Sequence, residues 1–298
     1  MLAGLNEPEI FSKFYKAFLP AAYLNYYLTG GAVDNAAATC GMGALVEGQG
    51  FVSVETSRVI LAARDRYRLA LETAVHTFCH VVLGQWYHMD VMLSVADSMS
   101  GSHLKSPSEL AAELGHALHG HGRVRLLLYL SGNGPPHDSE IQGSITDVLH
   151  DTAVGELTRG IHEGVAFASC DCFDARTATD AKMEPLVTTD GGTRSRYWLH
   201  LIPTVLNVPL QLLESGEFGT AIGAARLGMS TSNLASMDRV LLVTKHLRSD
   251  RSNQSLSDTF AEAHRDFAAA YPVIKRVNQM ATEDGHGSSC LVNKEVLF

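Results

Sequence analysis

Cysteine, positive charge and long apolar runs are all scarce in this sequence. Its five cysteines are scattered over 298 residues, too few and of the wrong parity for a disulfide framework in a chain of this length. The formal net charge of -9 leaves no general positive field that would hold nucleic acid or an anionic membrane. No apolar run reaches membrane-spanning length, and the first residues lack the pattern of a signal peptide. We therefore expect a cytoplasmic protein with no nucleic-acid and no membrane partner.

The remaining composition is that of an ordinary globular protein. Hydrophobic residues make up 46% of the chain and charged residues 18%, which suits one large or two modest domains with a sizeable core. Short runs at 50–55, 57–63 and 74–83 predict the strands of an antiparallel meander or a set of hairpins. Farther along, a strand at 184–192 that ends in glycines and a strand at 208–215 that is followed by a glycine turn each lead into a helix. This repeat predicts an α/β layout.

Helical patterns account for much of the remaining chain. Apolar residues at helical spacing predict helices at 7–20, 91–99, 106–120, 153–175, 196–206, 221–229 and 257–277. We expect one further strand at 123–130. The polar, serine-rich residues 229–258 predict a loop before the last helix.

The stretch GGAVDNAAATCGMG, residues 30–43, places a single acid at a bend before a helix. Asp34 and Asn35 can cap that helix, because a short polar side chain accepts hydrogen bonds from the amides of a first turn. Alternatively, glycines beside an acid let a ligand approach the backbone closely and present the carboxylate to a cleft. The local residues alone leave both interpretations open.

Several histidines and cysteines have spacings that invite a metal interpretation. No second pair of ligands at matching spacing completes a zinc site for any of them. We therefore interpret them as packing or surface residues and predict no metal site of their making. The residues concerned are His116, His119 and His121, then His76, Cys79 and His80, and finally Cys170 and Cys172 within the helix predicted at 153–175.

The order of the motifs is more specific than any one of them. The succession runs GGAVDNAA, EGQGFVSVETSRVILAA, AVHTFCHVVLGQWYHMDVMLS, YLSGNGPPHD, HEGVAFASCDC, GGTRSRYWLHLIPTVLNVPLQ and GTAIGAA. Over about Gly30 to Met229, and again at FAAAYPVIK, the chain resembles the FGGY family of carbohydrate kinases, most closely its xylulokinases. The resemblance implies an α/β fold of the actin-like ATPase (ribonuclease H-like) type, with the chain as the C-terminal lobe of a two-lobed sugar kinase.

The resemblance also implies a division of the chain. Residues 1–46 would be a remnant of the N-terminal lobe that includes the turn with the catalytic aspartate, and 47–278 the nucleotide-binding C-terminal lobe. We expect residues 279–298 to be a disordered tail. The activity implied is phosphorylation of D-xylulose or a related ketopentose, with ATP as phosphate donor and Mg²⁺ as its companion ion.

Site residues carry over from the family position by position. Asp34 matches the general base that takes the proton of the attacking sugar hydroxyl, and Asn35 lies beside it on the substrate side. Thr56 and Ser57 match the turn that faces the phosphates. The positions that match the adenosine pocket are Gly191, Gly192, Thr193 and Ser195.

Three residues depart from the family pattern at ligand-facing turns. Glu55 and Arg58 flank the phosphate-facing hydroxyls, and they and Asp190 all stand where the family has glycine. A carboxylate beside a polyphosphate repels it. Two hypotheses follow: half of an ATP-dependent sugar kinase, or a truncated, non-catalytic binding module of the same fold. In both we expect the isolated chain to be inactive and to self-associate, as a dimer for example, through the surface that the missing lobe leaves uncovered.

Overall fold

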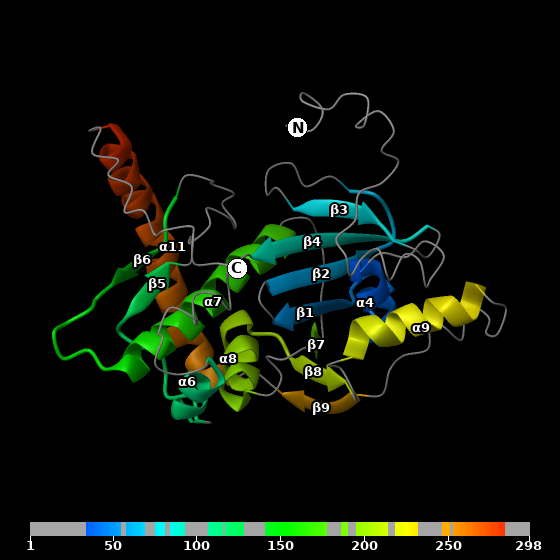
Figure 1. The fold of residues 1–298 in the computed structure, drawn as a ribbon, viewed down its shortest axis with the longest axis horizontal. Coiled ribbons are helices and arrows are strands. Elements are labelled where there is room, and N and C mark those ends of the chain that lie inside the picture. Colours follow the sequence, from blue (N-terminus) through cyan, green and yellow to red (C-terminus); the bar gives the residue numbers. More distant parts are fainter. Residues whose placement is uncertain are drawn as a thin grey trace, which may run out of the picture.

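A seven-stranded sheet organises the molecule, with its strands in the order β3-β4-β2-β1-β7-β8-β9 (Figure 1). The structure is a computed structural model, and it describes residues 34–54, 58–68, 75–80, 84–92, 107–115, 117–127, 141–177, 186–189, 195–213, 218–231, 246–250 and 253–283. The helix predicted at 7–20 lies outside the described residues.

One half of the sheet is antiparallel, and it is built of two hairpins rather than a meander, which is the second of the two predicted alternatives. β1 (Gly50–Val54) pairs with β2 (Arg58–Arg64), β2 with β4 (Trp86–Met92), and β4 with the edge strand β3 (His76–Cys79), all antiparallel. The sequence analysis placed a helix at 91–99, which is wrong at its start because β4 extends to Met92. The sequence analysis predicted no strand at 86–92, although Tyr87 and Met89 alternate there with His88 and Asp90, polar residues that are also buried.

The other half of the sheet is mainly parallel. β7 (Leu186–Thr189) runs parallel to β1, and β8 (Leu210–Leu213) parallel to β7. β9 (His246–Asp250) closes this edge antiparallel to β8. The prediction of a continuous loop over 229–258 is therefore wrong at β9, whose sequence HLRSD is polar because an edge strand needs little apolar surface.

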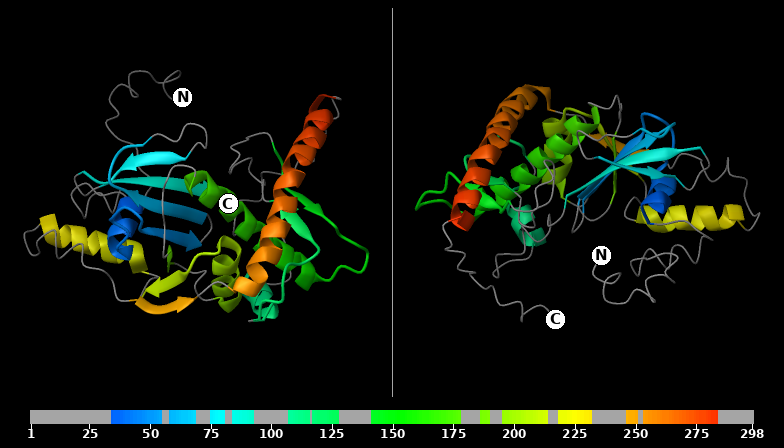
Figure 2. Two further views of the ribbon diagram at one scale, coloured as in Figure 1. Left: turned by 180° about the vertical axis from the view of Figure 1, so that it is seen from behind. Right: turned by 90° about the horizontal axis from the view of Figure 1, so that it is seen from above.

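Helices lie on both sides of the sheet, which makes a three-layer α/β/α arrangement (Figure 2). α4 (Asp34–Met42) and α9 (Gly219–Thr231) pack against each other beside one face. α7 (Val154–Thr177), α8 (Arg196–Leu206) and α11 (Gln254–Glu283) gather on the other. All five confirm predicted helices, although α11 begins earlier and ends later than 257–277 and runs past the expected start of the tail at residue 279.

Alternation along the central strands supplies both cores. Phe51 and Leu61 are register partners that face α4, whereas Val52 and Ile60 are partners that face α7 and α8. Successive strand residues point to opposite faces, so neighbouring residues of β1 belong to different cores. The larger core also takes in Phe260 of α11.

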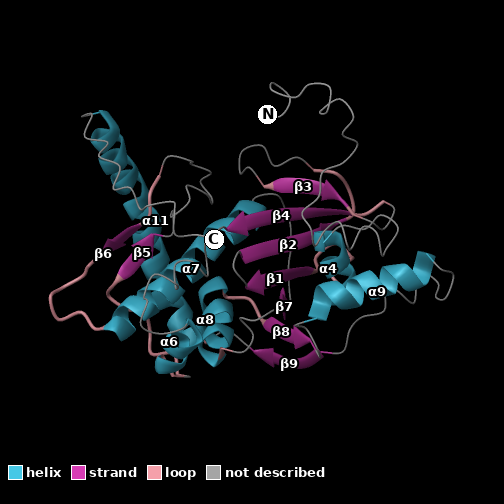
Figure 3. Ribbon diagram, in the orientation of Figure 1, coloured by secondary structure: helices cyan, strands magenta, loops and turns pink. Residues whose placement is uncertain are grey.

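A smaller two-stranded sheet lies beside α7 (Figure 3). It pairs β5 (Arg125–Leu127) antiparallel with β6 (Ser144–Thr146), a strand that the sequence analysis did not predict. α6 (Pro107–Glu113) precedes it and stops well short of the predicted end at residue 120, since Gly115 takes a positive φ of 71°. In the described part of the chain, no helix is both long enough and apolar enough to cross a membrane.

Candidate active site

The carboxyl ends of two neighbouring parallel strands mark the candidate nucleotide edge of the sheet. β1 ends at Val54 and β7 at Thr189, and the register pairs Ser53 with Thr189. The two strands therefore end side by side, at the edge where open α/β folds bind ligands. The residues that follow them in the sequence include the predicted phosphate-facing and adenosine-facing residues.

Thr56 and Ser57 lie outside the described residues, and so do Gly191, Gly192 and Thr193. The departures at Glu55 and Asp190 fall in the same undescribed stretches, and of Arg58 only the backbone is described, as the first residue of β2.

Ser195 is described and is the N-cap of α8. Its backbone is extended, with φ -86° and ψ 113°, and its Oγ accepts a hydrogen bond from the Trp198 amide at 3.4 Å. Such a cap opens a helix whose first amides point outward and favour negative charge. Ser195 thus lies between the predicted adenosine-binding residues and α8, whose apolar side chains are buried in the larger core.

Asp34 is the first residue of α4, so the predicted position of the acid at the start of a helix is confirmed. The side chains of Asp34 and Asn35 lie outside what the structure describes, and the roles of cap and catalyst, which one residue can fill together, stay predictions. The helix behind them is described in detail from Ala37 onward.

Glycines bring α4 and α9 into backbone contact. A Cβ on Gly41 would lie 1.8 Å from the Gly219 carbonyl oxygen, and a Cβ on Gly223 would lie 1.7 Å from that of Ala37. No side chain fits at either position, so the two helices touch at a distance that only glycine permits. Because Gly41 meets Gly219 while Ala37 meets Gly223, the two helices run antiparallel.

The C-terminal end of α4 is tied down by both backbone and side-chain groups. Gly43 turns into the left-handed region with φ 73°, and the Ala44 amide donates to the Thr39 carbonyl at 3.0 Å, the bond of a Schellman motif. From α9, the Arg226 guanidinium donates through Nη1 to the carbonyls of Cys40 at 2.9 Å and Gly41 at 3.4 Å. A cation at this end also complements the helix dipole.

A buried side-chain pair fixes the flank of α4. The fully buried Thr39 hydroxyl forms a hydrogen bond with Nε2 of His80, which follows β3. Burial lowers the pKa of His80 to about 4, so the ring is neutral at physiological pH. Burial likewise raises the pKa of the neighbouring Cys40 thiol to about 12, which makes it a packing group rather than a nucleophile.

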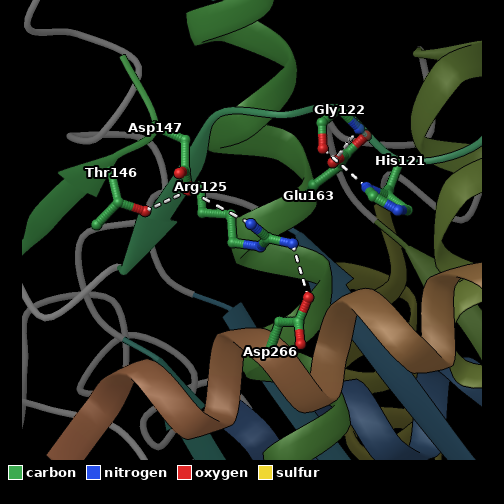
Figure 4. A network of polar contacts seen from close by, with 7 residues as sticks. All are labelled: His121, Gly122, Arg125, Thr146, Asp147, Glu163 and Asp266. Carbon is green, nitrogen blue, oxygen red and sulfur yellow. Dashed lines mark hydrogen bonds and ion pairs between the residues drawn. The ribbon is translucent and has the colours of Figure 1, made fainter. Parts of the chain in front are cut away.

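A second polar cluster lies on the other side of the molecule, around α7. The buried Glu163 carboxylate accepts from the Gly122 amide at 2.8 and 2.9 Å (Figure 4). It also accepts from Arg159 Nε at 2.8 Å. Burial raises the pKa of Glu163, and the Arg159 hydrogen bond opposes that rise. In the same view the Arg125 guanidinium forms ion pairs with Asp147, which follows β6, and with Asp266 of α11. These contacts hold loop segments against helices.

Of the histidines and cysteines considered for metal binding, His116 lies outside the described residues. His80 contacts α4, the Nδ1 of His121 donates to its neighbour's carbonyl at 2.8 Å, and Cys170 donates to the Val205 carbonyl inside the core. Within the described ranges no group of three or more histidine, cysteine, aspartate or glutamate side chains could hold a metal ion.

Sequence reasoning missed the residues that fix α4. Arg226 and His80 are distant in the chain from the helix that they hold, and neither belongs to a recognisable motif. The one available signal was the pair of glycines Gly219 and Gly223 at helical spacing, which is typical of a close helix contact.

Comparison with known proteins extends these observations. The model of the "FGGY family of carbohydrate kinases, C-terminal domain" matches residues 51–232. The chain is 36% identical to the xylulose kinase of Klebsiella pneumoniae over 67% of its length and 42% of that protein's. It is 31% identical to the Escherichia coli (strain K12) xylulose kinase over 78% of its length and 48% of that protein's. The chain thus spans about half the length of these curated relatives.

A solved structure resembles the fold closely. The crystal structure described as a xyloylose kinase from Brucella ovis superposes with a TM-score of 0.83 at 31% identity, covering 93% of this chain and 72% of that one. The strand order and this neighbour confirm the predicted fold class, an α/β fold of the actin-like ATPase, ribonuclease H-like type.

Proposed function

Because the chain belongs to the FGGY family of carbohydrate kinases, we propose that it is the nucleotide-binding half of an ATP-dependent kinase for D-xylulose or a related ketopentose. The observation that carries the proposal is the pairing of β1 with β7. It supports a ligand edge to which two separate motifs of the sequence contribute.

Each candidate residue would have a distinct role in phosphoryl transfer. Asp34 would accept the proton of the sugar hydroxyl that attacks the γ-phosphorus, while the bond to the leaving ADP oxygen breaks. Thr56 and Ser57 would donate hydrogen bonds to phosphate oxygens. Since such transfer depends mainly on positioning and charge stabilisation, the placement of the carboxylate matters more than an unusual pKa.

The donor set suits a nucleotide better than a bare metal ion. Backbone amides at the start of α8 and hydroxyls after β1 are donors, which complement phosphate oxygens. Mg²⁺ binds commonly through substrate phosphates with one or two carboxylates. It would therefore enter with ATP and neutralise charge on the phosphates.

A coupled assay tests the proposal. The N-terminal half of the K. pneumoniae xylulose kinase, joined ahead of this chain, should release ADP faster with D-xylulose than without it. Asp34→Asn should abolish that increment because it removes the proton acceptor, while the exposed-site control Asp151→Asn should keep it. Equal ADP release with and without the sugar would overturn the proposal, and a panel of ketopentoses would define the substrate.

Glu55, Arg58 and Asp190 favour a second candidate, a non-catalytic module of the same fold. In that case the joined protein would bind sugar or nucleotide without turnover, and restoring glycine at these three positions would create the activity. Self-association through an uncovered surface also stays a prediction. Light scattering on the purified chain would detect it.

A further inference from the structure

The short helix α4 depends on its neighbours for its shape. It has nine residues, DNAAATCGM, and only its three alanines and the methionine are strong helix formers. Isolated helices shorter than about 12 residues are marginal in water. The contacts that hold α4 therefore decide both whether it is helical and where its first turn stands.

Those contacts lie along the whole of α4: Gly223 meets the Ala37 carbonyl near the first turn, and the Arg226 contacts lie at the end opposite to Asp34. The guanidinium of Arg226 meets the carbonyls of Cys40 and Gly41, and the Gly41 backbone lies against that of Gly219. At 1.5 Å of rise per residue, the first turn is only about 10 Å from this clamp. A rod this short has no room to bend, so a shift at its C-terminal end moves Asp34 as well.

Arg226 is the one charged side chain of α9. The carbonyls that it meets are among the last of α4, which have no partner within the helix itself. Replacing the arginine would leave these partly buried acceptors without a charged donor and would remove the cation from the negative end of the helix dipole. Closely packed glycines offer no side chain to take over that role.

We propose that Arg226 is a positioning residue for Asp34, which clamps the C-terminal end of α4 to α9 and thereby sets where the candidate base stands. The proposal rests on the proposed function, since it takes Asp34 as the base. It adds a physical link between the base helix and α9, the helix that follows β8 at the candidate nucleotide edge.

Hydrogen exchange on the intact chain tests the clamp without any need for turnover. Arg226→Met keeps much of the side-chain volume and removes the charge. It should speed amide exchange in residues 34–42 at least about tenfold, the factor for 1.4 kcal/mol, and leave α7 and α8 unchanged. Arg226→Lys should restore most of the protection. The control Arg265→Met removes an exposed arginine of α11 and should change nothing in α4.

Kinetics of the joined two-lobe protein then distinguish a role in positioning Asp34 from a role in nucleotide binding. Arg226→Met should lower kcat by about tenfold or more, because a misplaced base loses alignment, and should leave the KM for ATP within twofold. Arg226→Lys should recover most of the rate. A raised KM for ATP at unchanged kcat would overturn the proposal and make Arg226 a nucleotide contact.

The two failures are distinguishable. Absence of turnover by the unsubstituted joined protein would count against the proposed function alone. Unchanged exchange in α4 of a folded Arg226→Met chain would overturn the positioning role, whatever the turnover.

Discussion

The two helix pairs on opposite faces of the sheet are packed in opposite ways. α4 and α9 touch through backbone at Gly41 and Gly223, where no side chain fits. α7 and α8 are held apart by large side chains, with the ring of His162 lying 4.7 Å from that of Trp198. The backbones of the first pair are therefore held at a fixed distance, whereas the space between the helices of the second pair is filled by side chains.

The two kinds of packing determine different properties: the backbone contact determines where a helix lies, and the side-chain core determines how stable the fold is. A backbone contact fixes a distance closely but buries little apolar surface, so it suits the helix that starts with the candidate base. A volume of aromatic rings buries much more surface and supplies most of the hydrophobic stabilisation. We expect substitutions on the α7 side to change mainly the free energy of unfolding, and those on the α4 side to change geometry as well.

The largest loss of stability is expected from substitutions in the aromatic core on the α7 side of the sheet. Phe260 of α11 is fully buried and its ring lies 6.4 Å from that of Phe167. Phe260→Ala should lower the free energy of unfolding by about 4 kcal/mol, since it leaves a cavity among aromatic rings. Urea unfolding followed by circular dichroism measures it. Phe218→Ala removes a ring that is 57% exposed and should cost less than about 0.5 kcal/mol; equal costs would refute the comparison.

A smaller but more localised effect is expected at the backbone contact. Gly41→Ala adds one methyl group that meets the Gly219 carbonyl, so the helices must separate at a cost of about 3 kcal/mol. Hydrogen exchange should rise in α4 and α9 before it rises in α7. Gly155→Ala is the matched control, because its added Cβ meets nothing within 4 Å. If both substitutions were equally mild, the close contact would be absent in solution.

The two sides should share one pH dependence. Burial lowers the pKa of both His80, beside α4, and His162, beside α8, to about 4, below the ordinary value of 6.5. The unfolded chain therefore binds more protons between pH 6.5 and 4, and stability falls as the pH falls through that range. Each histidine should cost about 2 kcal/mol on going from pH 7 to pH 5.

Urea unfolding at the two pH values measures this loss. His80→Gln and His162→Phe should each remove about half of the pH dependence that the two rings cause. A stability that is the same at pH 5 and pH 7 would mean that neither ring is buried in solution.

Much of the fold follows from the sequence because its signals are local. The helix at 196–206 was predicted to the residue: Ser195 supplies the cap, and the following apolar stripe has helical spacing. The strands β9 and β4 were both missed. β9 is a polar edge strand, and the alternation in β4 was overlooked because its second face buries the polar residues His88 and Asp90.

The candidate site divides in the same way. The position of Asp34 at a helix start could be predicted from the glycines and polar residues around it. The contacts of Arg226 and His80 with α4 could not, because they join residues far apart in the chain through groups that any helix surface carries. The order of motifs in the sequence predicts which residues bind ligand, whereas only the packed structure shows which residues hold them in position.

Hydrogen exchange of the intact chain, with and without MgADP, tests the central claim most directly. If the carboxyl edge of β1 and β7 binds the nucleotide, exchange should slow in residues 51–57 and 186–199 and stay unchanged in α11, which lies on the far side of the larger core. Slowing confined to other segments, or none at saturating nucleotide, would contradict the account.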